Sequence, residues 1–162
     1  MNLLIRISFI SILFFVLQGC EYLNTINISP KQIKQQSTWN DRDQEPSFND
    51  CEGLKNDANI NCFKQIISNN ISYALGQRTF ISSEKLDQEI VVIIQIDSEG
   101  NFLLFEVEDE YDVISKIEFL YSELENIITN LPQALPAIKT NVGIKVKTQL
   151  KLPVRIIASS QK

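Results

Sequence analysis

Apolar residues follow helical and strand-like patterns over the C-terminal part of the chain. They recur at helical spacing in residues 62–75 and again in residues 112–131, with polar residues between them. Residues 89–96 are β-branched and almost continuously apolar, which predicts a well-covered strand, and residues 102–107 predict a second strand. The polar turn at 97–101 contains a glycine, so we expect the two strands to form a hairpin.

Residues 142–156 show the clearest alternation in the chain. One face is apolar except for Thr148, and the other face is basic and polar. The apolar face holds Val142, Ile144, Val146, Leu150, Leu152, Val154 and Ile156, and the other face holds Lys145, Lys147, Gln149, Lys151 and Arg155. This pattern predicts one long strand that is buried on one side only. Because its outer face is too charged to be covered by a helix, we expect the strand at or near a sheet edge.

The order helix, strand, strand, helix, strand predicts a small α+β domain. Its two layers would be helices on one face of a three-stranded antiparallel sheet, in the order α-β-β-α-β. Pro132 and Pro136 are expected to end the second helix and to lead into an extended connection. We expect the domain over residues 46–157, followed by a short tail at 158–162.

The N-terminal residues carry the pattern of an export signal. Arg6 precedes an almost wholly apolar run over residues 7–17. This run is shorter than the roughly 20 apolar residues of a membrane-spanning helix, and the small residue Gly19 follows it closely. We therefore predict a signal peptide over residues 1–19. The alternative is an uncleaved amphipathic or core helix, which would need a polar face that this segment lacks.

Residues 17–20, Leu-Gln-Gly-Cys, resemble the lipobox of bacterial lipoproteins. The resemblance implies cleavage before Cys20 and a diacylglycerol group on its sulfur, so that acyl chains would anchor the protein to a membrane. Glu21 follows the cysteine, whereas Asp at that position commonly retains lipoproteins at the inner membrane. The resemblance therefore implies a lipid-anchored envelope protein, at the outer membrane rather than the inner membrane.

Residues 20–45 are polar and biased toward Gln, Lys, Asn, Asp and Ser. This composition predicts a lipidated cysteine followed by a flexible tether, which would span roughly 25–30 Å as a coil of about 25 residues. Trp39 is the exception within this segment. Two interpretations stay open for it: the indole docks on the domain, or it is a lone exposed aromatic.

The two remaining cysteines, Cys51 and Cys62, are predicted to form a disulfide, because an exported chain folds in an oxidising compartment. The bond would close a loop of 12 residues, counted from 51 to 62, and would stabilise the fold by about 3 kcal/mol. The alternatives are a two-thiolate metal site and a redox pair. The spacing is not Cys-x-x-Cys and no second cysteine pair supplies further thiolates, which argues against both.

Charge and composition exclude several classes of function. The formal charge is −5, and removal of Arg6 with the signal leaves 14 basic and 20 acidic side chains, or −6. An acidic domain binds nucleic acid poorly, and the absence of histidine excludes His-based triads, His-Cys dyads and His-containing metal sites. The chain also lacks a Gly-rich phosphate loop and a Gly-x-Ser-x-Gly elbow. We therefore predict a protein that is not an enzyme and has no cofactor and no metal.

An acidic run between the second strand and the second helix is a candidate cation site. It comprises Glu106, Glu108, Asp109, Glu110 and Asp112. The spacing does not match a calcium loop, so the favoured interpretation is a solvated turn with carboxylates near a helix N-terminus.

An ordered set of short motifs resembles the C-terminal domain family of TonB-like proteins. The motifs are Cys51-Glu52-Gly53-Leu54, Cys62-Phe63, the hairpin at 91–100, Leu131-Pro132, Pro136-Ala137, the alternating residues 142–147 and Leu152-Pro153-Val154. Residues 73–76 depart from the family because they lack its Tyr-Pro, and residues 82–88 lack its glycine. The resemblance covers about residues 46–157 and implies an α+β domain that binds a peptide segment.

The basic face of the last strand is the one feature that indicates binding. In β-augmentation an extended partner segment pairs with the strand edge, and Lys145, Lys147, Lys151 and Arg155 would favour an acidic partner. The alternative is that exposed lysines prevent edge-to-edge aggregation. We therefore expect a non-enzymatic protein- or peptide-binding domain. A structural or accessory lipoprotein that supports an envelope or transport complex is the second hypothesis.

Overall fold

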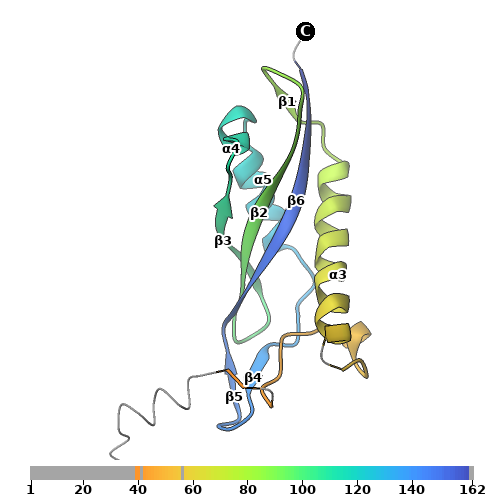
Figure 1. Ribbon diagram of the computed structural model, residues 1–162, viewed down its shortest axis with the longest axis vertical. Coiled ribbons are helices and arrows are strands. Elements are labelled where there is room, and N and C mark those ends of the chain that lie inside the picture. Colours follow the sequence, from red (N-terminus) through yellow and green to blue (C-terminus); the bar gives the residue numbers. More distant parts are fainter. Residues whose placement is uncertain (1–38, 41, 56, 161–162) are drawn as a thin grey trace, which may run out of the picture. The chain divides into compact units, whose positions relative to one another are not determined.

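A computed structural model describes residues 39–40, 42–55 and 57–160. The predicted signal peptide, Cys20 and most of the predicted tether lie outside these residues. The described part is α+β, with a four-stranded mixed sheet and a separate two-stranded sheet (Figure 1). Its helices are η1 (Asn49–Cys51), α3 (Asp57–Gly76), α4 (Val113–Lys116) and α5 (Leu120–Thr129). Its strands are β1 (Ile81–Ser82), β2 (Leu86–Ile96), β3 (Phe102–Glu108), β4 (Ala137–Lys139), β5 (Ile144–Val146) and β6 (Thr148–Ser160).

The main sheet has the strand order β1-β6-β2-β3. The long strands β2 and β6 pair antiparallel without interruption, from Leu86 opposite Ala158 to Ile96 opposite Thr148. The short β1 adds a parallel pairing with the last two residues of β6, which the sequence pattern did not indicate. Three strands, β6, β2 and β3, are antiparallel to their neighbours, but the sheet is four-stranded and mixed rather than three-stranded and antiparallel, because the parallel β1 joins it.

The predicted hairpin is confirmed, because β2 and β3 pair antiparallel on either side of the turn at residues 97–101. The Asp97 carboxylate accepts hydrogen bonds from the Asn101 side chain (3.0 Å), the Asn101 N–H (2.9 Å) and the Glu99 N–H (2.8 Å). These donors, the Asn101 side chain first, hold the pKa of Asp97 below its ordinary value. The carboxylate thus organises the turn, as expected for Asp in a tight connection.

Both segments predicted to be helical contain helix, but the bounds differ and the second segment is not one helix. The first begins at Asp57 rather than residue 62, and it buries Phe63, Ile67, Ile71 and Leu75 along one stripe. The prediction of one helix over residues 112–131 was wrong, because the segment is broken into α4 and α5. Phe119 lies at the break with a φ of 62°, a conformation that bulky residues rarely adopt.

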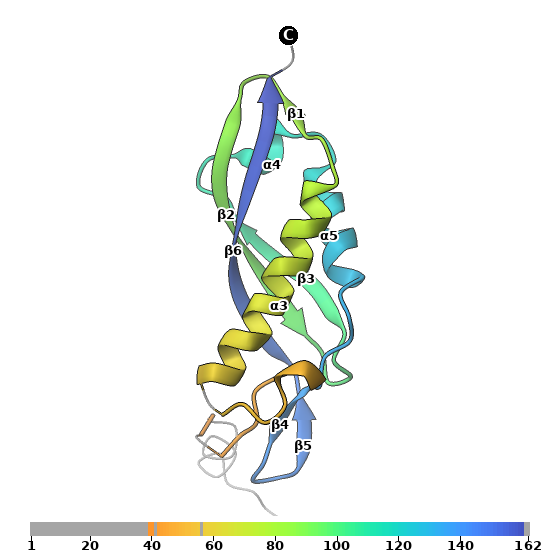
Figure 2. The ribbon, with the colours of Figure 1, turned by 90° about the vertical axis from the view of Figure 1, so that its right-hand side faces the viewer.

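One hydrophobic core lies between the sheet and the helices. Alternate residues of β2 and β6 point into it and meet the buried faces of α3 and α5, which cover the same face of the sheet (Figure 2). From β2 and β6 these residues are Ile90, Val92, Ile94, Ile96, Leu152, Val154, Ile156 and Ala158. This is the two-layer arrangement that the sequence predicts.

The prediction of a single strand over residues 142–156 was wrong. Gly143 has a φ of 66° and ends a turn, and β5 then pairs with β4 in a separate hairpin before β6 begins at Thr148. Val142 and Ile144 are therefore exposed, at 44% and 54%, rather than in the core. Alternation of apolar residues continues across the break, so the pattern gave no sign that the pairing partner changes.

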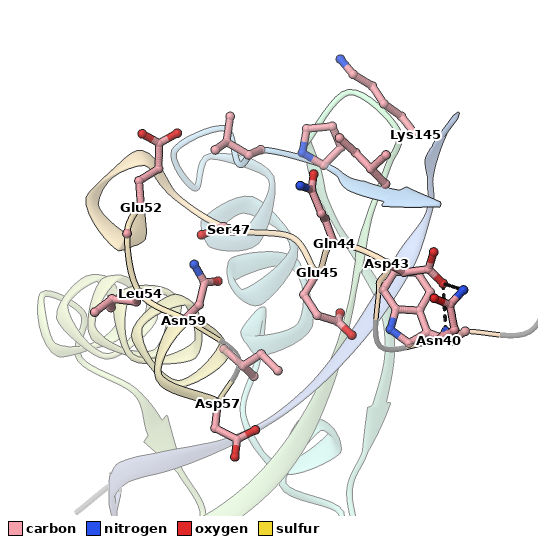
Figure 3. A pocket seen from close by; sticks show the side chains of 16 residues that line it. Asn40, Asp43, Gln44, Glu45, Ser47, Glu52, Leu54, Asp57, Asn59 and Lys145 are labelled. Atoms are coloured by element: carbon pink, nitrogen blue, oxygen red, sulfur yellow. Dashed lines mark hydrogen bonds between the residues drawn. The ribbon is translucent and has the colours of Figure 1, made fainter. Parts of the chain in front are cut away.

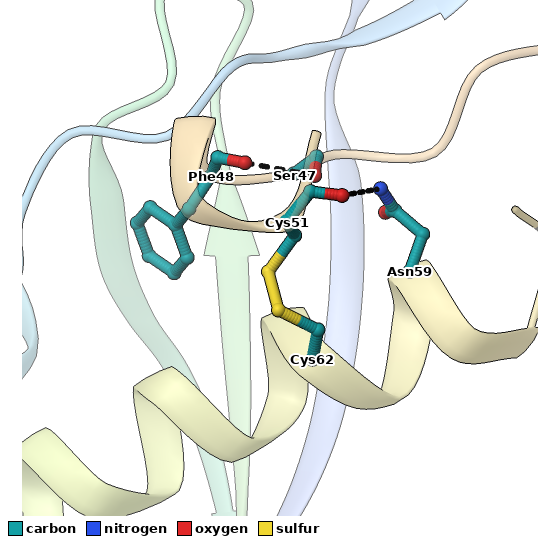
Figure 4. Close-up of a disulfide and its surroundings, with 5 residues drawn as sticks. All are labelled: Ser47, Phe48, Cys51, Asn59 and Cys62. Carbon is teal, nitrogen blue, oxygen red and sulfur yellow. Dashed lines mark hydrogen bonds between the residues drawn. A yellow bond between two sulfur atoms is a disulfide. The ribbon is translucent and has the colours of Figure 1, made fainter. Parts of the chain in front are cut away.

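The predicted disulfide is confirmed, with an S–S distance of 1.99 Å between Cys51 and Cys62 (Figure 4). It links η1 to α3, and the Cys51 carbonyl also accepts a hydrogen bond from the Asn59 side chain at 3.0 Å. Next to it, the Phe48 ring packs on Phe63 with ring centres 4.9 Å apart. The entry segment is thereby fixed to the core.

Candidate binding surface

One edge of β6 is unpaired along most of its length within the described part of the chain. β2 occupies its other edge, whereas β1 pairs only with Ser159 and Ser160. The unpaired stretch therefore runs from Thr148 to Ala158. An open edge of this kind presents backbone N–H and C=O groups that can pair with another extended chain.

The direction of each backbone group on this edge follows from one hydrogen bond. The Ser159 N–H donates to the Phe80 carbonyl at 2.9 Å, so it points away from β2. Because the register of β2 with β6 has no irregularity, every second residue before Ser159 points the same way. The outward backbone groups therefore belong to Gln149, Lys151, Pro153, Arg155 and Ile157.

Pro153 lies in the middle of this outward set and has no N–H to donate. Its position causes no loss to the sheet, because a group at this position does not bond to β2. Two pairs of donors remain, Gln149 with Lys151 and Arg155 with Ile157. Any strand that pairs with this edge therefore receives no N–H hydrogen bond from Pro153, at the centre of the paired stretch. A proline within an alternating run indicates an edge strand, so this feature was available in the sequence.

Two of the four predicted partner-binding side chains are in ion pairs on the outer face of the sheet. The Arg155 guanidinium donates to both oxygens of Asp87, each at 2.6 Å, and Lys151 pairs with Glu108. The hydrogen bonds from Arg155 hold the pKa of Asp87 below its ordinary value. These pairs reduce the positive charge that β6 offers to an acidic partner.

The other two predicted side chains, Lys145 and Lys147, are not on β6. Lys145 belongs to β5, and Lys147 lies between β5 and β6. Both are exposed, and neither forms an ion pair with any of the residues that the structure describes. The structure thus separates the four predicted residues into a neutralised pair on β6 and a second pair in and just after β5.

A hollow of about 870 Å³ adjoins this hairpin. Described residues between Trp39 and Ser47 form one side, and the rest comes from the turn at 52–54, the start of α3, the connection at 135–136, β4 and β5 (Figure 3). The segment is held by paired backbone hydrogen bonds between Gln44 and Ile138, both 2.9 Å. The sequence predicted that the domain starts at residue 46, whereas backbone hydrogen bonds to β4 already begin at Gln44.

Asp43 and Lys139 form a buried ion pair at 2.6 Å, with side-chain exposures of 0% and 6%. Burial alone would raise the pKa of Asp43, but the hydrogen bonds from Lys139 and from the N–H groups of Asn40 and Thr140 outweigh it and lower that pKa. The Lys139 ammonium also lies 5.3 Å from the centre of the Trp39 ring. Trp39 therefore docks on the domain. Nothing in the sequence connects these residues, which are about a hundred positions apart.

The acidic run between β3 and α4 organises a turn. Asp109 accepts hydrogen bonds from the N–H groups of Tyr111 at 3.3 Å and of Ile114 at 2.7 Å, which agrees with carboxylates near a helix start. Among the described residues, no group of three or more acidic or cysteine side chains has a geometry that could hold a metal ion. Another member of the run, Glu108, pairs with Lys151 of β6.

No helix of residues 39–160 is long and apolar enough to cross a membrane. The lipid-bearing residue predicted at Cys20 lies outside the described residues. Comparison of the chain with protein-family models, with curated proteins and with solved structures found no match.

Proposed function

We propose that this protein is a lipid-anchored envelope protein whose domain binds an extended segment of another protein along the open edge of β6. The single observation that carries the proposal is the row of outward backbone groups from Gln149 to Ile157. Backbone pairing would supply the affinity, and side chains of the partner would alternate between the core side and the solvent side of the sheet. This is also the mode that the resemblance to the TonB C-terminal domain family implies.

The position of Pro153 refines the proposal. A bound segment forms full pairing with Gln149 and Lys151 on one side and with Arg155 and Ile157 on the other. Opposite Pro153 it receives no N–H, so one of its carbonyls remains solvated. The ion pairs of Lys151 and Arg155 make side-chain charge a minor contribution, because a partner carboxylate would have to compete with Glu108 and Asp87.

An accessory lipoprotein without peptide capture is the second candidate function. Pro153 and the charged pairs on the outer face favour it, because both features discourage pairing at an edge strand. The two candidates differ in whether the backbone of β6 contacts a partner.

A matched pair of variants at Lys151 separates them. Lys151→Ala removes the ammonium but keeps the outward N–H, whereas Lys151→Pro removes both. The partner is first captured with a photo-reactive residue at Gln149 in intact envelopes. We expect Lys151→Ala to bind the captured partner nearly as well as the parent protein, and Lys151→Pro to bind at least about fivefold more weakly.

Neither variant should unfold the domain, because the Lys151 N–H makes no bond within the sheet. Leu152→Pro is the contrasting variant: it removes an N–H that bonds to β2 and should unfold the protein. Equal binding by folded Lys151→Pro and Lys151→Ala would refute pairing at this edge.

A further inference from the structure

We propose that the β4–β5 hairpin, together with Trp39, forms a second membrane contact that rests on an anionic lipid surface beside the anchor at Cys20. The proposal rests on the lipid attachment within the proposed function, and not on peptide binding at β6. Trp39 stacks under Lys139 of β4, and the Gln44–Ile138 hydrogen bonds fix the following residues to the same strand.

The chain that leads from Cys20 therefore joins the domain at the hairpin end. Nineteen positions separate Cys20 from Trp39, and the flexible tether predicted from the sequence would span about 24 Å over that length. With the predicted lipid anchor at Cys20, this distance would limit how far the hairpin end can lie from the bilayer surface. A short tether of this kind makes even a weak contact effective, because it raises the local concentration of the contacting surface.

The hairpin end exposes apolar side chains of the type that enter the headgroup region. Val142 and Ile144 are exposed on the hairpin, and Trp39 is 39% exposed beside it. Val142 and Ile144 flank Gly143 at the turn, and Ile144 is the first residue of β5. About half of each side chain is open to solvent. Tryptophan with neighbouring aliphatic residues is a common combination at a membrane interface.

Positive charge concentrates at the same place. The sequence has no Asp or Glu after Glu125, so the C-terminal part of the domain is purely basic. Internal ion pairs neutralise Lys139, Lys151 and Arg155, and they leave Lys145 and Lys147 for an external anion. Each lysine near an anionic bilayer raises partitioning by about fivefold.

The acidic residues at this end do not lie on the hairpin. The Asp43 carboxylate is fully buried against Lys139, and Glu45, Glu52 and Asp57 line the hollow. Figure 3 shows Lys145 and Asp57 on opposite sides of that hollow. The contact surface is therefore the hairpin with the exposed side of Trp39, although Trp39 and Lys145 also line the hollow beside these acidic residues.

Trp39 is the only tryptophan in the chain, so its fluorescence reports on this contact directly. The lipidated protein is reconstituted in phosphatidylcholine vesicles with or without phosphatidylglycerol, and brominated lipid serves as the quencher. We expect strong quenching of Trp39 in the anionic vesicles and at least about fivefold less in the neutral ones. The double variants Val142→Ser with Ile144→Ser, and Lys145→Gln with Lys147→Gln, should each lose most of the quenching while the protein still sediments with the vesicles.

The matched control is Ile81→Ser with Lys85→Gln, which removes an exposed aliphatic residue and a lysine near β1, at the opposite end of the domain. It should be quenched like the parent protein. A lipid-bearing protein whose Trp39 is equally quenched with and without the hairpin changes, or is not quenched in anionic vesicles, overturns this proposal alone. If the mature protein carries no lipid and does not sediment with the vesicles, the proposed lipid attachment at Cys20 is wrong as well. Binding of a partner at β6 is measured separately and is not affected by either result.

Discussion

Replacement of Gly100 by alanine tests how the β2–β3 hairpin is joined to the connection after α5. Gly100 has a φ of 90°, and a Cβ added there would lie 1.8 Å from the Ala134 carbonyl oxygen. The Ala134 N–H in turn donates to the Gly100 carbonyl at 2.9 Å. The turn and the chain after α5 therefore touch backbone to backbone, which only glycine permits.

The cost of this substitution can be separated into two parts. A left-handed backbone conformation costs an alanine about 1–2 kcal/mol. The Ala134 oxygen must also move to about 3.2 Å, which we expect to break the Ala134 hydrogen bond, worth about 1 kcal/mol, and to displace the buried Ala134 at about 1–3 kcal/mol. We therefore expect Gly100→Ala to destabilise the protein by about 3–6 kcal/mol.

Two other glycines provide matched controls. Gly53 and Gly143 also have positive φ, at 85° and 66°, but an added Cβ would meet no atom within 4 Å at either position. Alanine there should cost only the conformational part, about 1–2 kcal/mol. Urea unfolding followed by circular dichroism measures all three variants, provided that the slope with denaturant stays constant. Equal destabilisation by Gly100→Ala and Gly53→Ala would show that the close approach to Ala134 is not real.

Three further predictions concern the disulfide, the buried ion pair and the edge proline. Replacing Cys51 and Cys62 together by serine should lower the free energy of unfolding by about 3 kcal/mol, and reductant should then have no further effect on the melting temperature. Folding lowers the pKa of Asp43, so this carboxylate stabilises the folded protein at pH values above its unfolded pKa of about 4. The stabilisation is lost as the pH falls through the lower pKa of the folded protein. Asp43→Asn should therefore be less stable at pH 7 and should show a shallower loss of stability in acid titrations; an unchanged acid profile would contradict the role of the pair with Lys139. Pro153→Ala adds an outward N–H to β6 and should strengthen partner binding by about fivefold in a direct titration, whereas weaker binding would contradict backbone pairing.

Local features of the sequence predicted local structure well. The Asp97–Asn101 turn, the hairpin that it closes and the apolar stripe of α3 each depend on residues within one element or two adjacent ones. The Cys51–Cys62 disulfide was predicted because the two cysteines remain as a pair once Cys20 is assigned to the predicted lipid, and because an exported chain folds in an oxidising compartment.

Features that depend on distant pairing were not predictable. The alternation through residues 142–156 is the same whether one strand continues or a hairpin at Gly143 intervenes, because side chains alternate in both cases. The contact of Asp43 with Lys139 joins distant segments, and no pattern in one sequence encodes it. The ion pairs of Lys151 and Arg155 across the sheet likewise follow from strand order, so the neutralised state of two predicted binding residues became visible only in the structure.

The most direct test of pairing at β6 is amide hydrogen exchange of the strand, measured residue by residue with and without the captured partner. In the free protein the outward amides of Lys151, Arg155 and Ile157 should exchange rapidly, and the inward amides of Leu152 and Val154 slowly. Binding should slow the outward amides and leave the inward ones unchanged. If the partner binds while Lys151, Arg155 and Ile157 exchange as fast as before, and new protection appears on α3 or α5 instead, the edge of β6 is not the binding surface.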